Sequence, residues 1–88
     1  MSFGLRISDT AKGQIRRLDR DLQRRIIARL EQLCMSPVTP PMSDWVEGTR
    51  GLRRTRIGGW RVLFTVDVEN RVVDVVAVRP RGQAYRGL

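Results

Sequence analysis

The residues best suited to chemistry in this chain are arginines in the stretch Leu52 to Phe64, which reads LRRTRIGGWRVLF. Four arginines fall within these thirteen residues, on either side of a Gly-Gly pair. A guanidinium group presents its N–H donors as a planar fork that matches two oxygens of a phosphate or a carboxylate. The stretch therefore indicates either an anion-binding surface or a β-hairpin whose arginines only face water, and the placement of the side chains decides between the two.

The overall charge favours a negatively charged partner. The chain carries 17 Lys and Arg residues against 9 Asp and Glu, a formal net charge of +8, and every cation except Lys12 is an arginine. Such a surplus is typical of proteins that bind polyanions, so nucleic acid ranks first as a partner, an acidic protein second and an anionic membrane third. A GC-rich genome also explains a high number of arginines, but not their placement.

The numbers of histidine and cysteine residues restrict the kinds of catalysis and metal binding that are possible. The sequence has no His, which excludes His-based general acid–base catalysis, and its single Cys leaves too few ligands for a zinc site. Cys34 has no partner for an internal disulfide and fits a reducing cytosol. No apolar run approaches the roughly 20 residues of a membrane span, and the N-terminus lacks a signal-peptide pattern. We therefore expect a single cytoplasmic domain, residues 1–88, that needs no metal, cofactor or membrane.

The hydrophobic pattern predicts the elements that must position the arginines. Phe3, Leu5 and Ile7 alternate with polar residues, which predicts a short strand with one buried face. Apolar residues then recur at spacings of three and four from Ala11 to Leu33, which predicts a helical hairpin. The expected elements are a strand at Phe3 to Ile7, helices at Thr10 to Leu18 and Asp21 to Met35, a loop at Ser36 to Gly51, and strands at Leu52 to Ile57, Trp60 to Val68 and Arg71 to Val78.

This order, β-α-α-β-β-β, predicts an α+β domain in which the helical hairpin packs on a small, largely antiparallel sheet. The N-terminal strand comes first, and the last three strands form an antiparallel meander. The tail from Arg79 to Leu88 is too short and too rich in glycine to predict a helix.

The Gly-Gly pair sets the register of the first hairpin. Gly58 and Gly59 suit a two-residue type I′ turn, in which both central residues need positive φ. Arg56 then pairs with Arg61, and the alternation of side chains places Arg54 on the same face. The other face carries apolar residues that point to the core: Ile57, Trp60, Val62, Phe64 and Val66.

A bound anion would change the energetics of this arginine face. Like charges directly opposite each other destabilise a sheet by up to roughly 1 kcal/mol. A phosphate between the guanidinium groups would replace this repulsion with charge-assisted hydrogen bonds. Three arginines that extend separately into water remain the simpler interpretation.

Taken in order, these segments resemble the RelE-type toxins of bacterial toxin–antitoxin systems. That family's pattern combines L-x-G, a variable loop, L-x-R-x-R-hydrophobic-G-x-aromatic-R-hydrophobic, a Val-rich strand and a basic segment that ends in Tyr. The corresponding pieces here are Val46-Glu47-Gly48, GLRRTRIGGWRVLFTVD, VVDVVAV and RPRGQAYR. The stretch ISDTAKGQIRRLDRDLQRRIIARLEQL is similar to the family's helical hairpin. The likeness covers nearly the whole chain.

The resemblance implies the small RelE-like fold and an endoribonuclease, an mRNA interferase that cleaves mRNA in the ribosomal A site and so inhibits translation. Carried over by position, the catalytic residues fall on Arg61, Arg81 and Tyr85, and the RNA-binding and phosphate-binding pair on Arg54 and Arg56. RNA supplies its own nucleophile, the 2′-hydroxyl, so positioning and charge stabilisation can supply most of the rate without a metal. The general base stays unassigned, because arginine is protonated at every accessible pH.

The resemblance also implies partners. These are a cognate acidic antitoxin of the RelB type, the ribosome and mRNA, with operator DNA bound by the toxin–antitoxin complex through the antitoxin. Two other functions stay open. One is a toxin of the related ParE type, which shares the scaffold but acts on DNA gyrase, and the other is a degenerate toxin that only binds RNA or ribosomes.

The sequence departs from the family pattern at several positions. Arg53 and Thr55 fall on the expected core face, where the family usually has aromatic or aliphatic residues. Pro80 stands where His is frequent, which leaves the acid–base assignment open. We expect Arg79 to be an ordinary surface cation.

Overall fold

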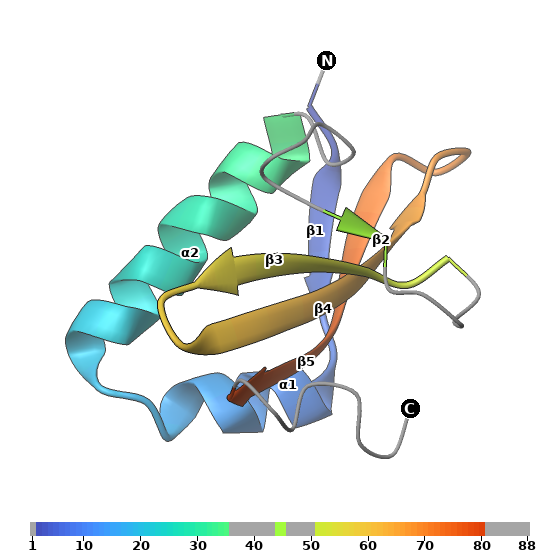
Figure 1. The fold of residues 1–88 in the computed structure, drawn as a ribbon. Helices are drawn as coiled ribbons and strands as arrows, with labels where there is room; N and C mark the ends of the chain where they lie inside the picture. Colours follow the sequence, from blue (N-terminus) through green and yellow to red (C-terminus); the bar gives the residue numbers. More distant parts are fainter. Residues whose placement is uncertain (1, 36–43, 46–50, 81–88) are drawn as a thin grey trace.

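A computed structural model describes residues 2–35, 44–45 and 51–80. Within these residues, two helices and five strands follow one another (Figure 1). They are β1 (Gly4–Ile7), α1 (Asp9–Arg16), α2 (Arg20–Met35), β2 (Asp44–Trp45), β3 (Arg53–Ile57), β4 (Trp60–Asp67) and β5 (Val72–Pro80). The predicted α+β order is therefore confirmed, with one short addition, because β2 lies inside the segment that the sequence predicted to be loop.

Local side-chain hydrogen bonds determine where both helices begin. Ser8 has extended backbone angles and its hydroxyl accepts a hydrogen bond from the Ala11 N–H at 3.0 Å, the geometry of an N-cap. A carboxylate oxygen of Asp19 accepts a hydrogen bond from the Leu22 N–H at 2.8 Å. Acidic side chains in the first turn are also favoured by the helix dipole. Asp19 thus starts α2 where the sequence predicted the hairpin to reverse.

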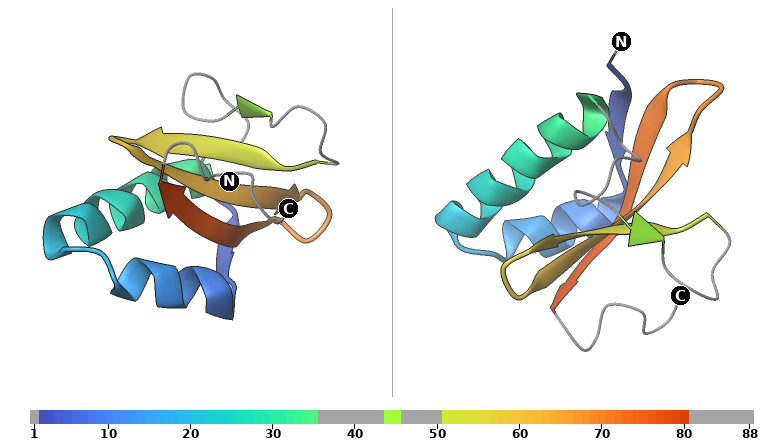
Figure 2. Two further views of the ribbon diagram at one scale, coloured as in Figure 1. Left: turned by 60° about the horizontal axis from the view of Figure 1, so that its bottom comes forward. Right: turned by 45° about the horizontal axis from the view of Figure 1, so that its top comes forward.

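The strands form one mixed sheet in the order β1-β5-β4-β3-β2. β1 pairs with β5 in parallel, and the other neighbours are antiparallel. Both helices lie on one face of this sheet (Figure 2). The opposite face, which we call the outer face, is therefore the one that the helices leave uncovered.

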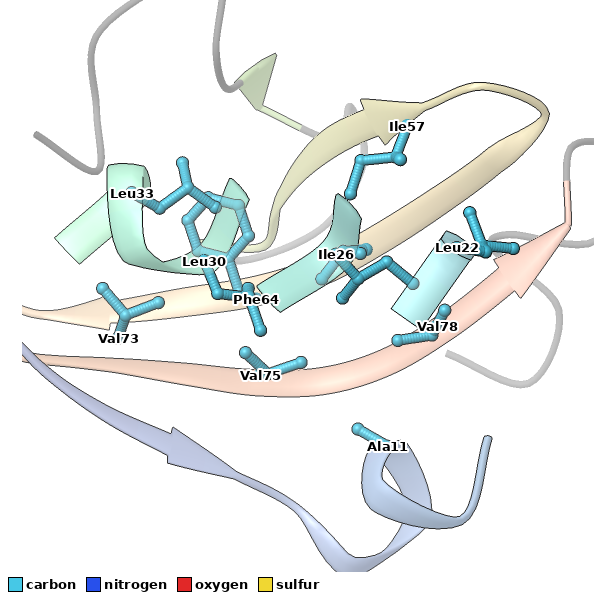
Figure 3. Close-up of a cluster of buried hydrophobic side chains, with 11 residues drawn as sticks. Ala11, Leu22, Ile26, Leu30, Leu33, Ile57, Phe64, Val73, Val75 and Val78 are labelled. Carbon is cyan, nitrogen blue, oxygen red and sulfur yellow. The ribbon is translucent and has the colours of Figure 1, made fainter. Parts of the chain in front are cut away.

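The core fills the space between the helices and the sheet (Figure 3). The helix α2 contributes a buried stripe of Leu22, Ile26, Leu30 and Leu33. Ala11 of α1 packs against the same cluster and is fully buried. The strands contribute residues from their helix-facing side: Ile57, Val62, Phe64, Val73, Val75 and Val78.

A second, smaller cluster lies on the outer face and contains Leu52, Leu63 and Ala77, with Val76 packed against it. Both faces of β4 and β5 are therefore apolar near their centre. This matches the near-continuous run of apolar residues in VVDVVAV.

Two local predictions were wrong. Gly58 has φ of 58°, whereas Gly59 is not among the positive-φ residues, so the turn does not have the two positive φ angles of a type I′ turn. One positive φ at the first central residue is the pattern of a type II′ turn, which also joins strands of native twist. In addition, Leu5 is 41% exposed, so β1 does not bury the whole face that its alternation predicted.

Candidate functional site

The hairpin formed by β3 and β4 has the register that the sequence predicted. Ile57 pairs with Trp60, Arg56 with Arg61, and Arg54 with Leu63. Since Ile57 belongs to the core under the helices, the residues that alternate with it point to the outer face. The three arginines Arg54, Arg56 and Arg61 therefore share the outer face, and the expectation that they lie on one side of the ribbon is confirmed.

The structure adds a fourth arginine to this face. Arg79 on β5 pairs directly with Arg61, which in turn pairs with Arg56 on β3. These three residues form a line across three adjacent strands, and we call them the arginine row. Arg79 was not predicted as a site residue, because its position depends on an irregularity in the pairing of β4 with β5.

That irregularity is a β-bulge. Phe64 pairs with Val75 but Leu63 pairs with Ala77, so Val76 is an extra residue on β5. An uninterrupted register would have placed Val78 opposite Arg61 and turned Arg79 toward the helices. The bulge instead buries Val78 in the main core and brings Arg79 to the outer face.

The arginine row brings like charges into close positions. A two-residue hairpin closes with a hydrogen-bonded pair, so the next pair, Arg56 and Arg61, is a non-hydrogen-bonded pair with closely spaced Cα atoms. Arg56 is exposed and the other two are half-buried. One Arg61 nitrogen, Nη1, donates a hydrogen bond to the Trp60 carbonyl at 3.2 Å.

The carboxylates that β4 and β5 place on the outer face lie at the other end of these strands. Asp74 forms an ion pair with Arg6 of β1, with 3.4 Å between nitrogen and oxygen. Asp67 accepts hydrogen bonds from the side chain of Asn70 at 2.8 Å and from its backbone N–H at 3.1 Å. These hydrogen bonds lower the pKa of Asp67. On β4 and β5 the outer face thus has arginines at one end and carboxylates at the other, separated by the apolar cluster around Leu63.

The two unexpected polar residues on the helix-facing side of β3 are both buried. Arg53 is 4% exposed and Thr55 is 1% exposed. The Thr55 hydroxyl accepts a hydrogen bond from Arg29 of α2 at 2.7 Å. A polar contact between α2 and β3 therefore replaces part of the apolar packing that this position would otherwise make.

Two of the predicted catalytic residues, Arg81 and Tyr85, lie outside the described residues. Within the described ranges, no three His, Cys, Asp or Glu side chains gather closely enough to hold a metal ion. In the same part of the chain, no helix is both long and apolar enough to cross a membrane.

The chain is similar to known toxins. A family model described as the ParE toxin of the type II toxin–antitoxin system parDE matches residues 5–85. No curated protein sequence gives a significant match. Among solved structures, the RelE–RelB complex of the archaeon Pyrococcus horikoshii superposes with a TM-score of 0.81 at 26% identity, over 96% of this chain and 100% of that chain.

Two bacterial complexes show the same fold at lower identity. The toxin–antitoxin complex RelBE2 of Mycobacterium tuberculosis matches with a TM-score of 0.80 at 19% identity, over 92% of this chain and all of that chain. The intact E. coli RelBE complex matches with a TM-score of 0.80 at 20% identity, over 90% of this chain and 96% of that chain.

Proposed function

The chain belongs to the ParE toxin family of type II toxin–antitoxin systems, within the RelE/ParE superfamily, and from this premise we propose that it is a ribosome-dependent mRNA endoribonuclease. The observation that carries the proposal is the arginine row on the outer face of the sheet. Three guanidinium groups on adjacent strands suit a phosphodiester whose charge increases during cleavage.

In the proposed reaction the 2′-hydroxyl of the RNA attacks the adjacent phosphate, and the 5′-oxygen of the next nucleotide leaves. Arg61 and Arg81 hold the scissile phosphate and stabilise the extra negative charge of the pentacoordinate transition state. Arg54 and Arg56 bind the phosphate and the neighbouring backbone. Arg79 joins this set because it pairs with Arg61 on the same face.

Two protons must move in this reaction, one from the 2′-hydroxyl and one to the leaving oxygen. Tyr85 takes part in proton transfer or stacks on a base of the mRNA. A tyrosine has a reference pKa of about 10, and cations held close to a phenol favour its phenolate form. Arginine cannot be the base, since it does not lose its proton in proteins. The ribosome supplies the second surface that holds the mRNA strand in line for attack.

The antitoxin is the protein partner that this family membership implies. The similar structures from Pyrococcus horikoshii and E. coli are both complexes with RelB-type antitoxins. A net charge of +8 favours rapid, salt-sensitive capture of an acidic antitoxin segment. In this proposal the antitoxin shields the arginine face, and the complex binds operator DNA through the antitoxin.

A cell-free translation extract tests the proposal. Purified protein is added to the extract, and the 5′ ends of a reporter mRNA are mapped with and without active ribosomes. We expect site-specific cleavage that depends on translation and that Arg61→Ala abolishes, with Tyr85→Phe strongly reducing it. Arg16→Ala, an exposed arginine of α1, removes the same charge away from the outer face and should leave cleavage intact. Intact mRNA with the wild-type protein would overturn the proposal.

The family model favours a second candidate, because it describes a ParE toxin. A ParE-like toxin would inhibit DNA gyrase without cutting RNA. In a supercoiling assay with purified gyrase, inhibition by the wild-type protein together with intact mRNA would support this alternative. Binding to ribosomes without either activity would instead indicate a toxin that only binds RNA.

A further inference from the structure

One side chain of α2 reaches across to the strand that carries two of the site arginines. Arg29 Nη1 donates one hydrogen bond to the Thr55 hydroxyl at 2.7 Å and a second to the Arg56 backbone carbonyl at 3.0 Å. A single guanidinium nitrogen carries two hydrogens, so it can make both bonds at once. Arg29 is half-buried and Thr55 is almost fully buried.

The bond to the Arg56 carbonyl holds the edge of β3 near the tip of the hairpin. In the non-hydrogen-bonded pair formed by Arg56 and Arg61, the Arg56 peptide groups point away from β4. On that side, the described part of β2 pairs with Arg53 and Arg54. Arg29 thus donates a hydrogen bond to the backbone carbonyl of Arg56, the residue whose side chain belongs to the arginine row.

The residue type at position 29 is unusual for its surroundings. Its neighbour Leu30 is fully buried in the core, and Thr55 lies on the core side of β3. A pair of apolar residues would fill this space without having to satisfy a charge and a hydroxyl. The polar pair instead fixes the orientation of one particular peptide, because hydrogen bonds are directional and apolar contacts are not.

We propose that Arg29 is a positioning residue for the arginine row: it holds β3 so that the Arg56 side chain stays aligned with Arg61 and Arg79. The inference rests on the proposed function in that the row binds the phosphodiester of RNA. Arg29 acts through the backbone of β3 and is not itself required to touch the RNA. Its loss should therefore weaken RNA binding only while the Arg56 side chain is present.

A double-mutant cycle tests this dependence. Affinity for a 2′-O-methyl RNA oligonucleotide, which lacks the nucleophile and cannot be cleaved, is measured by fluorescence anisotropy for wild type, Arg29→Met, Arg56→Ala and the double variant. All measurements are made well below the melting temperature of each protein. Arg56→Ala keeps the backbone carbonyl that Arg29 binds but removes the side chain that Arg29 is proposed to align.

We expect Arg29→Met to lower the affinity by about fivefold or more in the wild-type background, within the range found for coupled neighbouring residues. In the Arg56→Ala background the same change should alter the affinity by less than about twofold. Arg29→Lys keeps the charge and a donor of similar reach, so it should restore part of the affinity. The control Arg24→Met removes one charge from an exposed position on the same helix and should have the smaller effect of a distant charge.

Equal losses for Arg29→Met in both backgrounds would overturn the inference, because they would show a general effect of charge or stability. An effect no larger than that of Arg24→Met would overturn it as well. Thr55→Val provides a second variant of nearly the same shape, and it should reproduce part of the Arg56-dependent loss. Wild-type protein that binds the oligonucleotide but leaves mRNA intact would refute the proposed nuclease, while the cycle would still decide the role of Arg29. Failure of the wild type to bind the oligonucleotide would refute the role of Arg29 in RNA binding, while the cleavage assay in the translation extract would still decide the nuclease.

Discussion

Arg79 lies directly opposite Arg61 because β5 has one more residue than β4 between the pairs on either side of the bulge. The extra residue, Val76, changes which face every later side chain of β5 occupies. One inserted residue therefore has two consequences. Val78 packs under the helices, and Arg79 completes a line of three arginines.

The first prediction concerns Arg79, which the sequence alone suggested to be a simple surface cation. We expect Arg79→Met to lower the affinity for the 2′-O-methyl RNA oligonucleotide by about tenfold, the loss of one or two hydrogen bonds to a charged group. The dependence of the affinity on salt should also become less steep, since about one phosphate contact is lost. Anisotropy titrations at several salt concentrations measure both quantities. The matched change Arg16→Met on α1 should leave the affinity within about twofold, and equal losses for both variants would show that only total charge matters.

Features of this site that depend on residues close together in the sequence could be predicted, whereas features that depend on contacts between distant segments could not. The arginine pairing of β3 with β4 follows from a local signal, the Gly58-Gly59 turn, and was predicted correctly. Arg79 was missed because the bulge at Val76 depends on how two buried strands pack on both of their faces. The bulge could have been suspected from VVDVVAV, in which strict alternation gives way to adjacent apolar residues.

Two other features of the structure were not predicted, because they too depend on contacts outside the local sequence. The strand β2 has only two residues, too few to give an alternating pattern, so nothing in the sequence indicates its pairing with Arg53 and Arg54. Thr55 looked out of place on a core face until its partner Arg29, 26 residues earlier, was known. In contrast, the helices and their starting residues depend on neighbours within a few positions, and these were predicted to within a few residues.

The second prediction concerns the stability of the free protein. Replacing Arg56 with Thr removes one of two like charges in a directly opposed pair and introduces a residue with higher β propensity. We expect the free energy of unfolding to rise by a few tenths of a kcal/mol up to about 1 kcal/mol, while RNA affinity falls. Urea unfolding at low salt measures the change in stability. Added phosphate should then stabilise the wild type more than the variant, because the anion binds the native arginine row. A variant that is less stable and equally responsive to phosphate would contradict the idea that the row is an anion site.

The third prediction concerns the acidic end of the outer face. Hydrogen bonds from Asn70 lower the pKa of Asp67, with the side-chain amide as the largest cause. Asn70→Ala should therefore raise the pKa of Asp67 toward its ordinary value, which an NMR pH titration of the carboxyl carbon can follow. A lowered native pKa means that the interaction stabilises the protein above the ordinary pKa of an Asp and that this contribution is lost as the pH falls through the native pKa. The stability difference between wild type and Asn70→Ala should accordingly shrink below about pH 4. A difference that stays constant through that range would show that Asn70 acts only by shaping the turn.

The fourth prediction concerns the strand that carries Arg79. The side-chain oxygen of Gln14 in α1 accepts a hydrogen bond from the Val78 N–H at 2.6 Å, on the edge of β5 beyond the last residue that pairs with β1. Val78 is buried, so Gln14→Leu should leave this N–H without its side-chain partner in an apolar environment. We expect a loss of about 1–3 kcal/mol in the free energy of unfolding, measured by urea denaturation.

Gln32→Leu, at an exposed position of α2, is the matched control and should change the stability by less than about 0.5 kcal/mol. Amide hydrogen exchange locates the effect. If Gln14 fixes the end of β5, exchange of the Val78 amide should accelerate far more than exchange of amides in α2. A uniform acceleration would mean that Gln14 contributes to global stability alone. Acceleration confined to the end of β5 would show that each helix holds one end of the arginine row. The helix α1 does so through Gln14, next to Arg79, and α2 does so through Arg29, next to Arg56.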